Sequence, residues 1–135
     1  MLEEFKAFCV HPDKTPPSGY MKLRYHFVFD VKIDGRYKAR WVMDGNLSPP
    51  MPRKDCFACV VSTEAVRLGF TLAQIHNLKC VAGNVGNAFL MAFTCKKIYL
   101  FAGPEFGKLK GTIMIMVKAV YGTKTAALRF HKTLS

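Results

Sequence analysis

Basic side chains at alternate positions of a predicted β-hairpin are the first feature of this 135-residue chain that could do chemistry. Strand-forming residues fill 25–33 and 36–43, and strand side chains alternate between two faces, so Lys38 and Arg40 share a face. Arginine binds phosphate as a planar fork, and lysine binds it as a point charge. The pattern predicts either a phosphate site, with Lys32 and Arg36 nearby, or a solvated strand face with no ligand.

A second segment with chemical potential runs from Cys80 to Leu90. Its apolar start predicts a strand over 80–85, its glycines predict a turn, and the Asn-Ala-Phe-Leu sequence that follows can open a helix. A carboxylate at the end of such a strand often holds Mg²⁺ over a triphosphate, because Mg²⁺ prefers carboxylate and phosphate oxygens. Here that place is taken by Asn84, whose amide carries no charge and substitutes poorly.

The distribution of charge favours a polyanionic partner and argues against a metal-dependent active site. The net charge is +11, with a sequence pI of about 9.7. Beyond Glu64 the sequence contains ten Lys or Arg residues and a single acid, Glu105. A basic surface attracts polyphosphate backbones, although a solvated basic face with no partner fits the charge alone equally well. The acids up to and including Glu64 are scattered, and no pair has the spacing of an acid/base or metal-binding dyad.

Four motifs in order resemble the reverse transcriptases of copia-type retrotransposons. Residues 85–90 match the family's motif A, Asp-Val-Lys/Gly-Asn-Ala-Phe/Tyr-Leu, and Asn84 departs from it at the metal-binding aspartate. Residues 27–32 and 34–42 resemble the family's fingers segment, 102–107 its Pro-Glu-Phe-Gly turn, and 117–124 its Ala-Leu-Tyr-Gly-Leu-Lys block. In the last block Thr123 stands where leucine is usual, which marks divergence. The resemblance covers roughly residues 25 to 132.

The mixture of expected strands and helices indicates an α+β fold. The resemblance implies that it is a partial fingers/palm polymerase fragment with a β-hairpin, short mixed strands and two main helices. Residues 1–24 are a poorly defined amino-terminal segment, and 25–135 form a truncated reverse-transcriptase-like domain. The parent activity is RNA-directed DNA polymerisation with Mg²⁺, on a template-primer and a nucleotide triphosphate. No catalytic residue is intact, since Asn84 replaces the aspartate and the Tyr-Val-Asp-Asp segment is absent, so we expect an inactive relative without a metal or cofactor. The resemblance assigns nucleotide binding to Lys38, Arg40, Asn87, Ala88, Phe89, Gly122 and Lys124.

Two other interpretations are open. The chain could be a small basic module that binds nucleic acid and has no enzymatic role. A zinc site is a more distant possibility, because Cys56, Cys59, His76 and Cys80 have a plausible ligand spacing, but the flanking residues lack the usual knuckle pattern. An odd number of cysteines and no recognisable signal peptide favour reduced thiols and an intracellular location, cytoplasmic or nuclear. No apolar run is long enough to span a membrane.

The remaining pattern predicts the elements that would position these residues. Asp34-Gly35 predicts a two-residue hairpin turn. Ser62 caps a helix that ends at His76 and is apolar nearly all round, which predicts burial on more than one side. Further expected strands are 97–101 and 112–118, with loops over 11–19, 44–54 and 103–111. Further expected helices are two turns over 2–8, a short one over 87–93, and a last one over 123–134.

Overall fold

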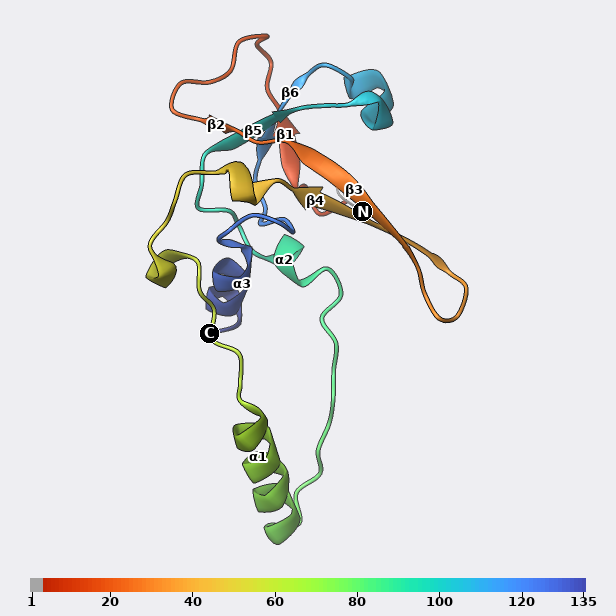
Figure 1. The fold of residues 1–135 in the computed structure, drawn as a ribbon, viewed down its shortest axis with the longest axis vertical. Coiled ribbons are helices and arrows are strands. Elements are labelled where there is room, and N and C mark those ends of the chain that lie inside the picture. The colour runs from red at the N-terminus through yellow and green to blue at the C-terminus, as the bar shows by residue number, and fades with distance from the viewer. Residues whose placement is uncertain (1–3) are drawn as a thin grey trace.

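A small mixed sheet forms the body of the molecule (Figure 1). The computed structural model describes residues 4–135. The four strands, in sheet order, are β1 (Phe8–Val10), β6 (Ile113–Met116), β5 (Ile98–Phe101) and β2 (Met21–Lys22). β6 pairs antiparallel with β1 and β5, and β2 pairs parallel with β5. The amino-terminal segment therefore supplies both edge strands.

A long β-hairpin projects from this body (Figure 1). Its strands β3 (Tyr25–Val31) and β4 (Tyr37–Met43) pair antiparallel over their full length. The predicted two-residue turn at Asp34-Gly35 is wrong. The Gly35 N–H donates to the Lys32 carbonyl, and Gly35 has φ +80°, which is a three-residue turn closed by a left-handed glycine.

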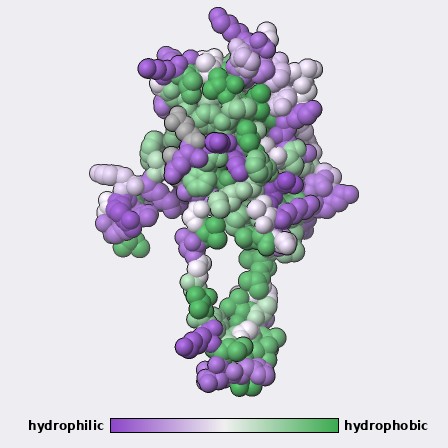
Figure 2. Space-filling model, turned by 180° about the vertical axis from the view of Figure 1, so that it is seen from behind, coloured by the Kyte–Doolittle hydropathy of each residue, from purple (hydrophilic) through white to green (hydrophobic). Residues whose placement is uncertain are grey.

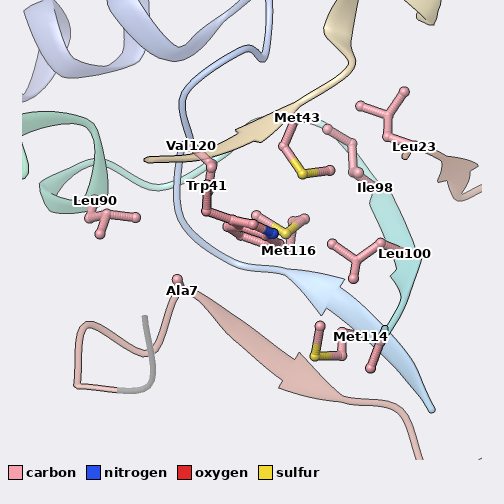
Figure 3. Packing of buried hydrophobic residues seen from close by; sticks show 11 residues of the cluster. Ala7, Leu23, Trp41, Met43, Leu90, Ile98, Leu100, Met114, Met116 and Val120 are labelled. Carbon is pink, nitrogen blue, oxygen red and sulfur yellow. The ribbon is translucent and has the colours of Figure 1, made fainter. Parts of the chain in front are cut away.

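The main hydrophobic core lies between the sheet and the base of the hairpin. Met43, Leu100 and Met114 are fully buried there, and Trp41 packs in the same cluster as Met116 (Figure 3). A second, smaller cluster of Ala92, Ala119 and Ala126 joins α2 (Ala88–Met91) to α3 (Ala126–Leu134). Short 3-10 helices span Gly45–Leu47, Arg53–Asp55 and Pro104–Leu109.

The helix α1 (Thr63–Ile75) lies on an arm that extends away from the body (Figure 1). Its predicted start is confirmed, because the Ser62 side chain accepts a hydrogen bond from the Ala65 N–H at 3.1 Å. Its predicted burial is wrong, since no residue of α1 is buried. Exposed hydrophobic residues are visible along this arm in Figure 2. Extended segments before and after α1 hold the helix away from the body, so no described element covers its apolar side chains.

Two other expected elements are also wrong. Residues 80–85 form no strand, because none of their backbone groups pairs with a neighbouring strand, and an isolated extended segment has no ladder to stabilise it. The helix expected over 2–8 is not formed: residues 4–6 make a turn and Phe8 opens β1, while residues 1–3 lie outside the described part. Lys6 has φ +49°, which ends any helical run, and the carbonyl of Ala7 accepts hydrogen bonds from the Val117 and Lys118 N–H groups. No helix among residues 4–135 is long and apolar enough to cross a membrane.

Candidate nucleotide and nucleic-acid site

A hollow of about 460 Å³ lies along β4, and we call it the hairpin cleft. Three segments that are far apart in the sequence form it: β4, the stretch that leads into α2, and the turn after β6. The cleft is lined by Lys38, Ala39, Arg40, Trp41, Asn84, Val85, Gly86, Asn87, Ala88, Phe89, Leu90, Val120 and Tyr121. Five of the seven residues assigned to nucleotide binding therefore meet in one place, together with Asn84.

The two cations of the cleft are positioned by the hairpin register. Arg40 lies opposite Val28 and Lys38 lies opposite Asp30, so both basic side chains share the polar face, as the alternation predicts. Both residues are half-buried. The Arg40 Nη1 atom lies 4.0 Å from the Asp30 Oδ2 atom, so one carboxylate partly offsets the two positive charges. The edge of the cleft keeps a net positive charge that suits phosphate.

The opposite wall is built around Asn87. Asn87 has φ +52° and ψ +37°, a left-handed conformation that asparagine tolerates better than most residues. Its carbonyl accepts a hydrogen bond from the Leu90 N–H at 2.8 Å, which starts α2. Phe89 then packs on the ring of Tyr121 at 4.5 Å and on that of Phe130 at 6.3 Å between centroids. Phe89 is thus a half-buried part of the second core cluster and also a wall of the cleft.

The cleft does not suit a magnesium ion. Asn84 lies at the wall in an irregular segment, and no residue that lines the cleft carries a carboxylate. Mg²⁺ in nucleotide sites is held by one or two carboxylates besides the phosphates. The neutral amides of Asn84 and Asn87 do not replace them.

The tip of the hairpin is less available to an anion than its sequence indicates. The Arg36 guanidinium donates to the Asp34 Oδ2 atom from Nε at 3.0 Å and from Nη2 at 2.6 Å. These hydrogen bonds hold the pKa of the Asp34 carboxyl below its usual value and the pKa of Arg36 above its usual value. Arg36 is therefore committed to its neighbour, whereas Lys38 and Arg40 face the cleft.

Gly122 and Lys124 do not line the hairpin cleft. A Cβ at Gly122 would overlap with the carbonyl oxygen of Met43, and a Cβ at Gly45 would overlap with the carbonyl oxygen of Gly122. These glycines allow close backbone packing at the end of β4. The Lys124 Nζ atom donates to the carbonyls of Ser48 at 2.7 Å and Pro49 at 3.1 Å, and so anchors the proline-rich loop. Their assignment to nucleotide binding stays a prediction.

Seven residues that line the cleft have no role in the assignment from sequence: Ala39, Trp41, Val85, Gly86, Leu90, Val120 and Tyr121. The Trp41 Nε1 atom is buried and has no hydrogen-bond partner among residues 4–135. Tyr121 precedes Gly122 in the block at 117–124, so the motif indicates this neighbourhood but assigns no role to the Tyr121 side chain. Trp41 lies on the apolar face of β4, where alternation indicates a core residue rather than a wall of the cleft.

The cysteines and histidines form no zinc site in the described part of the chain. Across residues 4–135, no group of three or more His, Cys, Asp or Glu side chains is placed to hold a metal ion. Cys56 is half-buried and Cys59 and Cys80 are exposed, all as free thiols. Cys80 lies on the extended arm beyond α1, and Cys56 lies after the short 3-10 helix Arg53–Asp55.

Comparison with known proteins agrees with the motifs at a coarse level. The chain is 25% identical over 109 residues to the transposon Ty1-DR4, Ty1-DR6 and Ty1-LR2 Gag-Pol polyproteins of Saccharomyces cerevisiae (strain ATCC 204508 / S288c). The alignments cover 80% of this chain but only 6–7% of each polyprotein. No family model matches, and no solved structure matches. The chain is thus distantly similar to a short region of the copia-type Ty1 Gag-Pol polyproteins.

Proposed function

We propose that the chain is a reverse-transcriptase-like region of a copia-type element, which binds nucleotides and nucleic acid through the hairpin cleft and does not polymerise DNA. The observation that carries the proposal is the meeting of Lys38 and Arg40 with residues 84–90 in one hollow. Both segments were assigned to the nucleotide from separate motifs. Their convergence in space supports a shared ligand.

The chemistry of the cleft fits a phosphorylated ligand. Lys38 and Arg40 supply charge-assisted hydrogen bonds to phosphate oxygens. Phe89 lines the opposite wall, where its ring can pack against a sugar or base. The net charge of +11 adds a long-range attraction to nucleic acid that salt weakens.

The same wall explains why we propose no catalysis. In the parent reaction two metal ions, held by aspartates, activate the primer hydroxyl and stabilise the pyrophosphate leaving group. Asn84 stands where the first aspartate belongs, and no lining residue is acidic. A cleft without carboxylates can bind phosphate, but this chain's residues give it no means to hold the metals.

The binding test compares two charge-matched double variants on a labelled oligonucleotide at several salt concentrations. For Lys38→Ala/Arg40→Ala, we expect the slope of log K against log salt to fall by roughly one to two units, about one per lost phosphate contact. The control Lys54→Ala/Lys79→Ala removes the same charge away from the cleft and should change the slope much less. Equal effects of both doubles would show diffuse charge and contradict a cleft.

The catalytic test is primer extension on a primed template with Mg²⁺ or Mn²⁺. We expect no incorporation above a control without protein. Template-dependent extension by the chain would refute the inactive assignment. The rival function, a basic module with no nucleotide site, also predicts no extension. It differs in predicting that free nucleotide does not displace the labelled oligonucleotide from Lys38 and Arg40.

A further inference from the structure

The outer half of the hairpin carries an aromatic surface that the fold does not use. Tyr37 is 91% exposed, Phe29 is 77% exposed and Val31 is 57% exposed. The register pairs Val31 with Tyr37, and Phe29 lies two residues before Val31, so all three side chains lie on one face of the ribbon. We call these three residues the outer aromatic face. Large exposed apolar groups gathered on one face indicate a binding surface.

This face continues a packed one. At the base of the hairpin, Tyr25 and Trp41 pack on Phe106 with ring centroids 5.9 Å and 6.0 Å away. Phe27 then stacks on Phe29 at 5.9 Å with an interplanar angle of 18°. The row of rings therefore runs from the core along the hairpin, whose ribbon projects from the body in Figure 1, and its outer residues Phe29 and Tyr37 are largely exposed. The Phe29 ring is stacked on one side by Phe27 and is otherwise largely exposed.

Charge decides what kind of partner fits. The opposite face and the turn carry Lys32, Arg36, Lys38 and Arg40 against two acids, Asp30 and Asp34. A second copy of a chain with net charge +11 would be repelled. A polyanion is attracted, and the polyanion with flat apolar groups is a nucleic acid. In a duplex those groups are already stacked on each other, whereas in a single strand their faces are open.

We propose that the outer aromatic face stacks the bases of a single-stranded nucleic acid, while Lys32, Lys38 and Arg40 of the same hairpin hold its phosphates. The inference rests on the nucleic-acid binding proposed above and adds to it a preference for single strands. Stacking on aromatic rings tolerates any base, so the preference is for strandedness rather than for sequence.

The test titrates the whole chain into two labelled ligands and follows their fluorescence anisotropy. One ligand is a poly-dT strand of about 12 nucleotides, a length within the usual site size of single-strand binders, and the other is a duplex of the same length. For Phe29→Ala and Tyr37→Ala, we expect binding of the single strand to weaken about tenfold each, since stacking is typically lost on truncation to alanine. Binding of the duplex should change less than about twofold, because its bases are already stacked. Tyr37→Phe keeps the ring and should bind as the wild type does.

Phe57→Ala is the matched control, because Phe57 is also an exposed phenylalanine and lies outside the hairpin. It should leave both ligands unaffected. Thermal melts check the fold of every variant, and the high exposure of both hairpin positions predicts unchanged melting. Equal losses for single strand and duplex, or no loss for either hairpin variant, would overturn the stacking while leaving the salt-dependent binding of Lys38 and Arg40 intact. No binding of the wild type to any nucleic acid at low salt would overturn both proposals.

Discussion

Gly122 gives the sharpest test of the packing between the turn after β6 and the end of β4. Its φ is +86°, and a Cβ there would overlap with the Met43 carbonyl oxygen. The two stretches of backbone are joined by a hydrogen bond from the Met43 N–H to the Tyr121 carbonyl at 2.8 Å. Substitution with alanine must therefore strain the backbone of Gly122 and also push the chains apart.

The magnitude follows from two contributions. A left-handed conformation costs alanine about 1–2 kcal/mol. Overlap in a packed site adds about 1–3 kcal/mol, and loosening the Met43–Tyr121 hydrogen bond is part of that change. We expect Gly122→Ala to lower the free energy of unfolding by about 2–5 kcal/mol, which is a large part of the total for a small domain.

Gly111→Ala is the control that separates the two contributions. Gly111 has φ +80°, close to that of Gly122, but nothing lies within 4 Å of a Cβ built there. Only the conformational cost should appear, about 1–2 kcal/mol. Urea denaturation followed by circular dichroism gives both values by linear extrapolation. Equal losses of stability for the two variants would refute the close packing at Gly122.

Three further predictions concern the hydrogen bonds of Tyr25 at the base of the hairpin, the substituted metal position Asn84 and the charge at the cleft. The Tyr25 hydroxyl donates to Glu105 and accepts from the Gly103 N–H at 2.7 Å, and burial, followed by the Glu105 hydrogen bond, raises the pKa of Tyr25 to about 12. The free energy of unfolding should therefore stay level below about pH 10, where the unfolded tyrosine is protonated, and should fall as the pH rises through about 12. Thermal melts at a series of pH values should show this fall for the wild type and not for Tyr25→Phe. The Tyr25→Phe substitution should also lower the free energy of unfolding by about 1–2 kcal/mol at neutral pH. Asn84→Asp should leave the stability unchanged or lower it by up to about 2 kcal/mol in thermal melts. Millimolar Mg²⁺ should not restore the lost stability, because one carboxylate supplies too few ligands. Stabilisation of this variant by Mg²⁺ would reveal a surviving metal site. Asp30→Asn removes the acid 4.0 Å from Arg40, so oligonucleotide affinity in anisotropy titrations should rise a few-fold at low salt, while unchanged affinity would argue that these cations do not contact phosphate.

The hairpin was the most predictable part of the fold, because its information is local. Alternation placed Lys38 and Arg40 on one face and Trp41 on the other, and the register confirms both. The turn between the strands differed because Asp34-Gly35 is also compatible with a longer turn in which only Gly35 is left-handed. The capped start of α1 was likewise readable from Ser62 and the sequence after it.

Elements that depend on distant partners were not predictable. The apolar pattern of 80–85 suits a strand, but a strand needs a free neighbouring edge, and none of the described strands pairs with this segment. The same applies to α1, whose hydrophobic residues indicate burial while no described element covers them. The weak helical pattern over 2–8 was also misleading, because residues 4–6 form a turn and Phe8 pairs with Met116 of β6.

The residues of the candidate site that belong to local motifs were predictable from the sequence, whereas the roles set by tertiary packing were not. The segments around Arg40 and Asn87 were identified separately, and the fold brought them together. Lys124 carries a charge that matches phosphate, but its contacts with the carbonyls of Ser48 and Pro49 depend on a loop distant in sequence. No local pattern distinguishes a lysine that anchors a loop from one that binds a ligand.

A titration of the ¹⁵N-labelled chain with dTTP, followed by NMR, tests most directly whether the hairpin cleft is the nucleotide site. We predict that the largest amide shifts fall at Lys38, Arg40 and residues 84–89, and that Lys38→Ala/Arg40→Ala abolishes them. Asn84 should shift without added Mg²⁺, because no lining carboxylate requires a metal bridge. Shifts centred on Lys124 and its loop, or none at millimolar nucleotide, would contradict the proposed site.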